Sequence, residues 1–143
     1  MRTRPSTSRS RDPEQFADGC VHYVSIAAGL AGGIDIVLAA ARRGDSRLLT
    51  GVAIYAAALL FLAVASAVNN MAGPSPRRSL LRRLDHAAIF LMIAGTYTPF
   101  VLRMGGAWGN GLLLVVWLGA LAGIVLLLLD WRRFDRISTA LYL

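Results

Sequence analysis

The stretch that decides the fold runs from Arg82 to Phe100 and reads Arg-Arg-Leu-Asp-His-Ala-Ala-Ile-Phe-Leu-Met-Ile-Ala-Gly-Thr-Tyr-Thr-Pro-Phe. Asp85 and His86 follow a basic pair and precede an almost uncharged apolar run that contains Gly95 and Pro99. Ionisable side chains within a membrane are rare and usually face a cavity or another helix. Gly and Pro are tolerated there when Thr hydroxyls and neighbouring helices satisfy the freed backbone groups. The stretch therefore predicts a membrane helix with a functional polar end on the cytoplasmic side.

The composition favours a protein with several membrane spans. Of the 143 residues, 56% are apolar and 16% are charged, and the mean hydropathy is +0.56. Soluble domains typically carry about 25% charged residues. The net charge of +7 would favour nucleic-acid binding on a soluble surface, but the arginines lie in the N-terminal tail and between the apolar runs, so we expect no nucleic-acid partner. The single Cys20 excludes an internal disulfide and a cysteine metal cluster.

Four apolar runs are long enough to cross a bilayer, which takes about 20 helical residues. The predicted spans are residues 21–41, 48–68, 85–102 and 112–129. Residues 1–13 are predicted to form a disordered basic tail, without a cleaved signal peptide, and Pro13 suits the first turn of the helix that follows. Residues 137–143 resemble the first two turns of a fifth span, so the chain is either truncated or its last segment lies on the membrane surface. The predicted fold is an all-α integral membrane protein with four full transmembrane helices and the start of a fifth.

The arginines predict the orientation of these spans. The tail, the second loop and the C-terminal end carry 11 arginines, whereas the first and third loops carry 4. Because basic loops remain on the cytoplasmic side, we expect a cytoplasmic N-terminus.

This topology brings polar side chains from the first three spans together at the cytoplasmic side. They are Glu14, Asp18, His22, Ser66, Asn69, Asn70, Asp85 and His86. Such a cluster can bind a metal or arrange a general base. It can equally form a hydrogen-bonded network that fixes the positions of the helices.

Two parts of this cluster have a simpler interpretation. Glu14, Asp18 and His22 recur at four-residue steps, so they share a helix face that continues through Ser25, Gly29 and Gly32. That face can make polar contacts at its lower end and let a neighbouring helix approach at its upper end. The Asn pair at the end of the second span is also suited to cap a helix C-terminus.

The third span resembles the third-helix signature of the hemolysin III family, which is related to the progestin and adiponectin receptors. The matching segments are Arg82-Arg-Leu-Asp-His-Ala-Ala-Ile-Phe90 and Ile93-Ala-Gly-Thr-Tyr-Thr-Pro-Phe100. Glu14, Asp18 and His22 resemble the family's first-helix motif, with Asp in place of Asn. Further matches are Trp108-Gly, Trp117 and the run from Arg132 to Tyr142. The resemblance implies the first part of a seven-helix bundle in the bacterial inner membrane.

The resemblance also implies a site, because the family is similar to membrane hydrolases that hold zinc near the cytoplasmic side. Their pattern has Ser-x-x-x-His at the end of helix two, an Asp opening helix three, and His-x-x-x-His in helix seven. Ser66 and Asp85 match the first and second elements, and the helix-two ligand position falls on Asn70. The chain ends before the helix-seven pair. Because Asn is a poor zinc ligand and catalytic zinc usually takes three protein ligands, we expect this chain to hold no zinc of its own.

Three functions remain open at this point. The chain is expected to be a family member without a catalytic zinc site, and the alternatives are a zinc-dependent hydrolase acting on a lipid amide and an oligomeric, cytolytic pore. Membrane lipid is the expected partner, and a homo-oligomer is an open alternative. An incomplete bundle would also expose inward-facing helix surfaces, which predicts low stability or self-association in detergent.

Overall fold

The chain folds into four long helices, as a computed structural model of residues 12–72 and 76–129 shows, with side chains described from Gly19 onward. They are α1 (Asp12–Arg42), α2 (Ser46–Met71), α3 (Arg78–Met104) and α4 (Gly106–Leu129). The described residues contain no strand. The prediction of an all-α protein with four membrane-length helices is confirmed. Residues 1–11 of the predicted tail and the predicted start of a fifth span lie outside the described residues.

Each helix is longer than the apolar run it contains. The helices have 31, 26, 27 and 24 residues, which corresponds to roughly 36 to 46 Å at 1.5 Å per residue. The hydrocarbon core of a bilayer is about 30 Å thick. The helix ends, which carry most of the polar residues, therefore reach the interfacial regions.

The connections between the helices at one side of the membrane are very short. Gly44, with φ +68°, ends the turn after α1, and Asp45 caps α2 because its Oδ1 accepts bonds from the backbone N–H groups of Arg47 (3.0 Å) and Leu48 (3.2 Å). A single residue, Gly105, separates α3 from α4, and it has φ +63°. Glycine adopts this backbone conformation without the steric cost that other residues meet. The chain therefore reverses direction at once.

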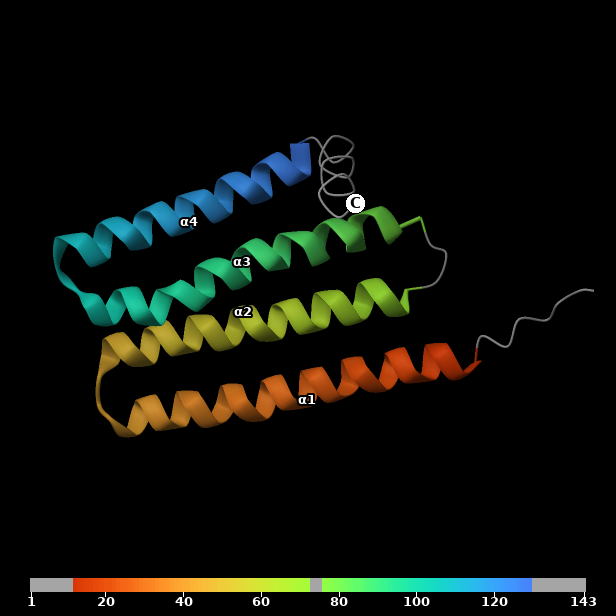
Figure 1. The fold of residues 1–143 in the computed structure, drawn as a ribbon, viewed down its shortest axis with the longest axis horizontal. Helices are drawn as coiled ribbons and strands as arrows, with labels where there is room; N and C mark the ends of the chain where they lie inside the picture. Colours follow the sequence, from red (N-terminus) through yellow and green to blue (C-terminus); the bar gives the residue numbers. More distant parts are fainter. Residues whose placement is uncertain (1–11, 73–75, 130–143) are drawn as a thin grey trace, which may run out of the picture.

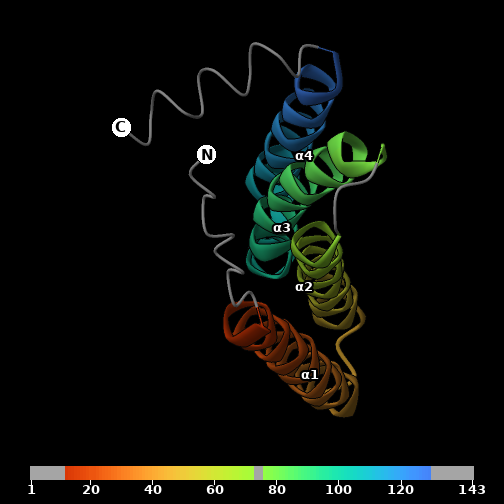
Figure 2. The ribbon, with the colours of Figure 1, turned by 90° about the vertical axis from the view of Figure 1, so that its right-hand side faces the viewer.

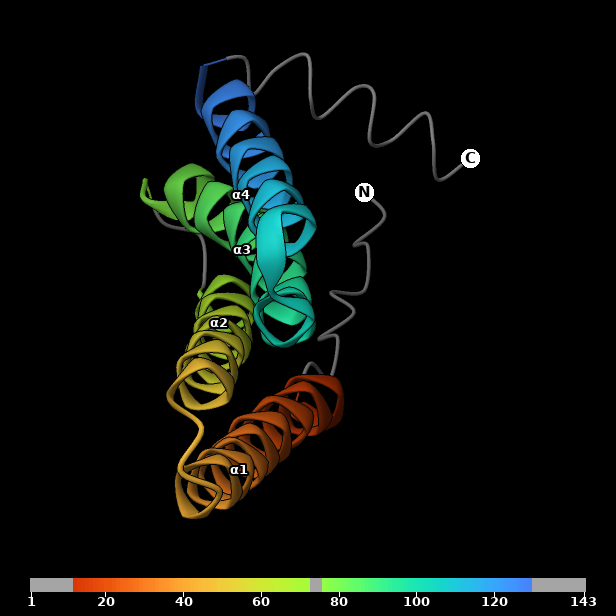
Figure 3. The same cartoon turned by 90° about the vertical axis from the view of Figure 1, so that its left-hand side faces the viewer.

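The helices form a curved, open row in chain order (Figure 1). Helix α2 packs between α1 and α3, and α4 packs on the far side of α3, so α1 and α4 lie at opposite ends of the row (Figures 2 and 3). The start of α1, the end of α2, the start of α3 and the end of α4 point to the same side of the row, toward the right of Figure 1. We call this the basic end, because the arginine-rich start of α3 lies there.

Small residues make the closest contacts between the helices. A methyl group added at Gly51 of α2 would lie 2.6 Å from Pro99 Cα of α3, and one added at Gly95 would lie 2.7 Å from Ala58 Cβ. Most of the buried apolar residues are alanines: Ala40, Ala56, Ala67, Ala87, Ala88, Ala94 and Ala120. Membrane helices associate in this way, because small residues let their backbones approach closely. Many of the large apolar side chains point outward instead, and the side chain of Leu129 is 78% exposed.

Helix α1 packs on α2 through part of the predicted small-residue stripe. A methyl group at Gly29 would lie 3.7 Å from Leu60 Cδ2, and one at Gly33 would lie 3.4 Å from Ala56 Cβ. Gly32 has no such neighbour within 4 Å. The contact therefore follows the i, i+4 pair Gly29 and Gly33, and the predicted role of Gly32 in it is wrong.

The threonines of α3 bond to its own carbonyl groups around Pro99. Thr96 Oγ1 donates to Met92 O and Thr98 Oγ1 donates to Ala94 O, each at 2.7 Å. Trp117 of α4 then donates from Nε1 to Thr98 Oγ1 at 3.2 Å. Thr98 is 1% exposed, so this chain of bonds satisfies a polar group within the helix packing.

Candidate functional site

Helices α1, α2 and α3 border an open hollow of about 500 Å³ near the basic end. Its polar lining consists of His22 and Ser25 from α1, Ser66 from α2 and Asp85 from α3, and we call the hollow the polar pocket. The rest of its lining is apolar: Val21, Leu59, Leu62, Ala63 and Ile89. Three residues predicted from the sequence, His22, Ser66 and Asp85, therefore line one pocket.

Helix periodicity explains why these residues meet. His22 and Ser25 are three residues apart on α1, as are Leu59 and Leu62 on α2, and Ser66 follows one turn later. Residues at such spacings share one helix face. Ser25 donates to Val21 O at 2.8 Å, which satisfies its hydroxyl hydrogen within α1. Its place in the pocket follows from its position three residues after His22.

The carboxylate of Asp85 is held by an amide from α2. Asn69 Nδ2 donates to Asp85 Oδ2 at 2.9 Å, and both side chains are half-buried. A hydrogen bond to a charged group contributes more than one between neutral groups. This bond therefore fixes Asp85 across the contact between α2 and α3.

Asn70 bonds to Ser66 instead. Its Nδ2 lies 3.0 Å from Ser66 O and 3.3 Å from Ser66 Oγ, and it donates to both. Helix α2 continues through both asparagines to Met71, and Ala72 is its C-cap. The Asn pair therefore marks the C-terminal turn of α2, as predicted, but the prediction that it caps the helix is wrong, because Ala72 is the C-cap.

Among the remaining residues of the predicted cluster, only His86 has a described side chain that can be compared with the pocket lining. His86 Nδ1 lies 2.8 Å from Arg82 O, one turn earlier on its own helix. His86 does not line the pocket. The backbones of Glu14 and Asp18 belong to α1, but their side chains lie outside the described residues.

A second hollow of about 390 Å³ lies at the other end of the same three helices, lined by Ile36, Leu48, Val52, Tyr55, Thr96, Pro99, Phe100 and Arg103. Its α2 residues continue the stripe of Leu59, Leu62 and Ser66, so both hollows lie over one face of α2.

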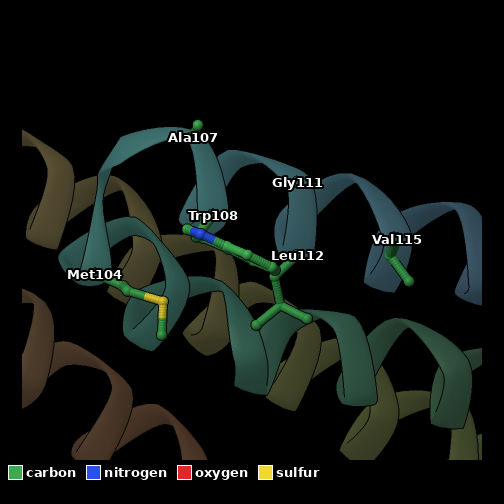
Figure 4. A pocket seen from close by; sticks show the side chains of 6 residues that line it. All are labelled: Met104, Ala107, Trp108, Gly111, Leu112 and Val115. Carbon is green, nitrogen blue, oxygen red and sulfur yellow. The ribbon is translucent and has the colours of Figure 1, made fainter.

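A larger hollow of about 840 Å³ lies at the turn between α3 and α4 (Figure 4). Its lining has no ionisable side chain: Met104, Ala107, Trp108, Gly111, Leu112 and Val115. The described linings of these two hollows contain no Asp, Glu, His or Cys side chain, so acid–base or metal chemistry points to the polar pocket.

The donors of the polar pocket do not fit a catalytic zinc ion. Such an ion usually takes three protein ligands and a water molecule. Among the residues that the structure describes, His22 and Asp85 are the ionisable side chains that line the pocket, and Asn70 directs its amide nitrogen to Ser66. The described residues contain no group of three His, Cys, Asp or Glu side chains that could hold a metal. An amide nitrogen, which carries hydrogens and no available lone pair, cannot replace an imidazole.

Comparison with known proteins identifies the family of this chain. Residues 13–143 match the family model described as Haemolysin-III related. The chain belongs to the hemolysin III family. It is 31% identical over 131 residues to a Hemolysin-3 homolog of Bacillus subtilis (strain 168), covering 91% of this chain and 62% of that protein. It is 30% identical over 131 residues to Hemolysin-3 of Bacillus cereus, covering 91% and 60%.

The chain thus spans less than two thirds of the length of these two relatives. No solved structure matches it. With its four membrane-length helices, this member of the hemolysin III family is a multi-pass membrane protein.

Proposed function

We propose that this chain is an inner-membrane protein of the hemolysin III family that works without a catalytic zinc of its own. The observation that carries the proposal is the pair of amide hydrogen bonds, Asn69 to Asp85 and Asn70 to Ser66. These bonds engage the family-matched Ser and Asp with neutral donors. Such a pocket can bind a polar group, and we expect it to do so without a Lewis acid that lowers the pKa of a water molecule.

Membrane lipid is the proposed partner of the polar pocket. Leu59, Leu62 and Ile89 provide an apolar wall beside Ser66 and Asp85. An amphiphile can place its chain against this wall and donate hydrogen bonds to the carboxylate and the hydroxyl. This combination of mostly apolar lining and few polar groups is typical of small-molecule sites.

The proposed orientation has the N-terminus in the cytoplasm. Arg77, Arg78, Arg82 and Arg83 lie at the basic end, where the arginine-rich tail and C-terminal segment join the described helices. The opposite end has Arg42, Arg43, Arg47 and Arg103. The excess at the basic end supports a cytoplasmic position for it, by the positive-inside rule.

A zinc-dependent hydrolase acting on a lipid amide is the second candidate. It is favoured by the meeting of His22, Ser66 and Asp85 in one pocket with an apolar wall.

The cytolytic pore has weaker support. Leu59 and Leu62 lie between the polar residues of the two hollows on this face of α2, so a pore would require an oligomer.

The test is the zinc content of the purified, detergent-solubilised chain, measured by elemental analysis for the wild type, Asp85→Ala and Asn70→His. We expect the wild type to hold far less than one zinc per chain, with no change in Asp85→Ala. Asn70→His adds an imidazole at the ligand position and tests whether the neutral amide limits zinc binding, so a rise in its zinc content above that of the wild type would support the proposal. Near-stoichiometric zinc in the wild type that falls in Asp85→Ala would overturn the proposal and support the hydrolase.

A further inference from the structure

The start of α3 concentrates positive charge. Arg77, Arg78, Arg82 and Arg83 lie within seven residues, and the sequence from Asn69 to Leu84 contains no Asp or Glu. Arg77 is the N-cap of α3 and makes no side-chain capping bond. The exposed backbone N–H groups and the helix dipole at such an end add to the attraction for an anion.

An apolar groove begins one helical turn after Arg77 and Arg78. It is a hollow of about 170 Å³ between α2 and α3, lined by Phe61, Val64, Ala65, Val68, Leu81 and Leu84. We call it the outer groove. None of these side chains is polar, and Phe61, Val64, Val68 and Leu84 are each at least 40% exposed.

The arginines and the outer groove share one face of α3. Arg77 has helical φ and ψ values of −87° and −3°, so it continues the helical spacing of Leu81 and Leu84 as positions i, i+4 and i+7. Arg78 is three residues before Leu81, and both arginines are exposed. The Arg78 guanidinium makes no hydrogen bond or ion pair with the residues that the structure describes.

The outer groove is separate from the polar pocket. The pocket uses Leu62 and Ser66 of α2, whereas the groove uses Val64 and Val68. Ala67 is 4% exposed and lies in the packing of α2 with its neighbours. The carboxylate nearest in sequence, Asp85, lines the pocket and bonds to Asn69. A ligand in the outer groove therefore meets cations without that carboxylate beside it.

We propose that the outer groove and the start of α3 bind an anionic phospholipid. The phosphate group lies by Arg77 and Arg78 at the interface, and one acyl chain lies along Leu81, Leu84 and Val64. The groove is much smaller than a phospholipid, so the rest of the lipid remains in the bilayer. A zwitterionic lipid carries a cation next to its phosphate, which these arginines repel. An anionic headgroup has no such cation, and juxtamembrane arginines attract it.

The experiment uses native mass spectrometry of the full chain in a nonionic detergent, with palmitoyl-oleoyl phosphatidylglycerol or palmitoyl-oleoyl phosphatidylcholine added. We expect the wild type to retain phosphatidylglycerol preferentially. Arg77→Gln together with Arg78→Gln should weaken its binding by about twentyfold to thirtyfold, since each arginine near an anionic surface contributes roughly fivefold. Ala65→Leu, which fills the groove and leaves the arginines intact, should also weaken binding.

The matched control is Arg42→Gln together with Arg43→Gln, which removes the same charge at the opposite end. It should leave the phosphatidylglycerol preference in place. Equal binding of the two lipids, or an equal loss in both double variants, would overturn the proposal. An unchanged affinity in Ala65→Leu would overturn the role of the groove. Far-UV circular dichroism checks that every variant keeps the helical content of the wild type.

Discussion

The contact between Gly51 and Pro99 makes a quantitative prediction about the α2–α3 packing. A methyl group at Gly51 would lie 2.6 Å from Pro99 Cα and 3.1 Å from Pro99 N. Carbon atoms in contact are about 3.5 to 4.0 Å apart, so the two backbones must separate by about 1 Å. Both obstructing atoms belong to the backbone and cannot rotate away. We expect Gly51→Ala to carry an overpacking cost of about 1 to 3 kcal/mol.

The control for this prediction is the same substitution at a glycine without neighbours. A methyl group at Gly119, within α4, would meet nothing within 4 Å. Both substitutions gain roughly 0.5 to 1 kcal/mol in helix propensity, so their difference isolates the packing cost. The measurement is the free energy of unfolding in mixed micelles, followed by circular dichroism during an SDS titration. If Gly51→Ala unfolds at the same SDS fraction as Gly119→Ala, the close approach of α2 and α3 is wrong.

Two further predictions concern the packing of α4 on α3. Trp117→Phe removes the donor to Thr98 and should lower the free energy of unfolding by about 0.6 kcal/mol, a typical value for a hydrogen bond between membrane helices. Trp108→Phe, at a side chain that is 88% exposed, is its control, and an equal loss in both would refute the reasoning. Gly123→Ala places a methyl group 2.5 Å from Phe90 Cε1 and should destabilise the protein. Because this obstacle is a side chain, Phe90→Ala should relieve it, with a favourable coupling of at least about 0.5 kcal/mol in a double-mutant cycle.

The sequence was sufficient to predict the four helices, because long apolar runs have few alternatives in a membrane. It placed their ends less well. Helix α3 begins at Arg78, before its predicted span, whereas α1 begins at Asp12, next to the Pro13 that the sequence already assigned to a first helical turn. Hydrophobicity marks the part of a helix that lies in hydrocarbon, whereas the helix itself continues as long as its backbone hydrogen bonds do. Hydropathy alone therefore does not predict the polar helical turns at the basic end.

The open row of helices could not be predicted either. Leu114 and Leu126 of α4 are 60% and 64% exposed, whereas Leu127 is fully buried. All three belong to an almost continuous run of apolar residues, and lipid and protein are equally good surroundings for a leucine side chain. The small residues indicate the packed face of a helix better than the leucines do. Gly123 and Gly109 each face α3 or its end, but Gly119 faces no neighbour, so a glycine alone does not identify the packed face.

The polar pocket shows the same limit at the level of single residues. Ser66 and Asp85 could be placed together because both lie at the same depth. The hydrogen-bond partner of Asp85 could not be predicted, because Asn69 and Asn70 are adjacent in sequence but point about 100° apart around α2. Which amide reaches Asp85 depends on how α2 is rotated against α3, and the Gly51 and Gly95 contacts fix that rotation. The chemistry of the pocket is thus determined by glycines several turns away, which hold Asn69 against the carboxylate and leave Asn70 bonded to Ser66 on its own helix.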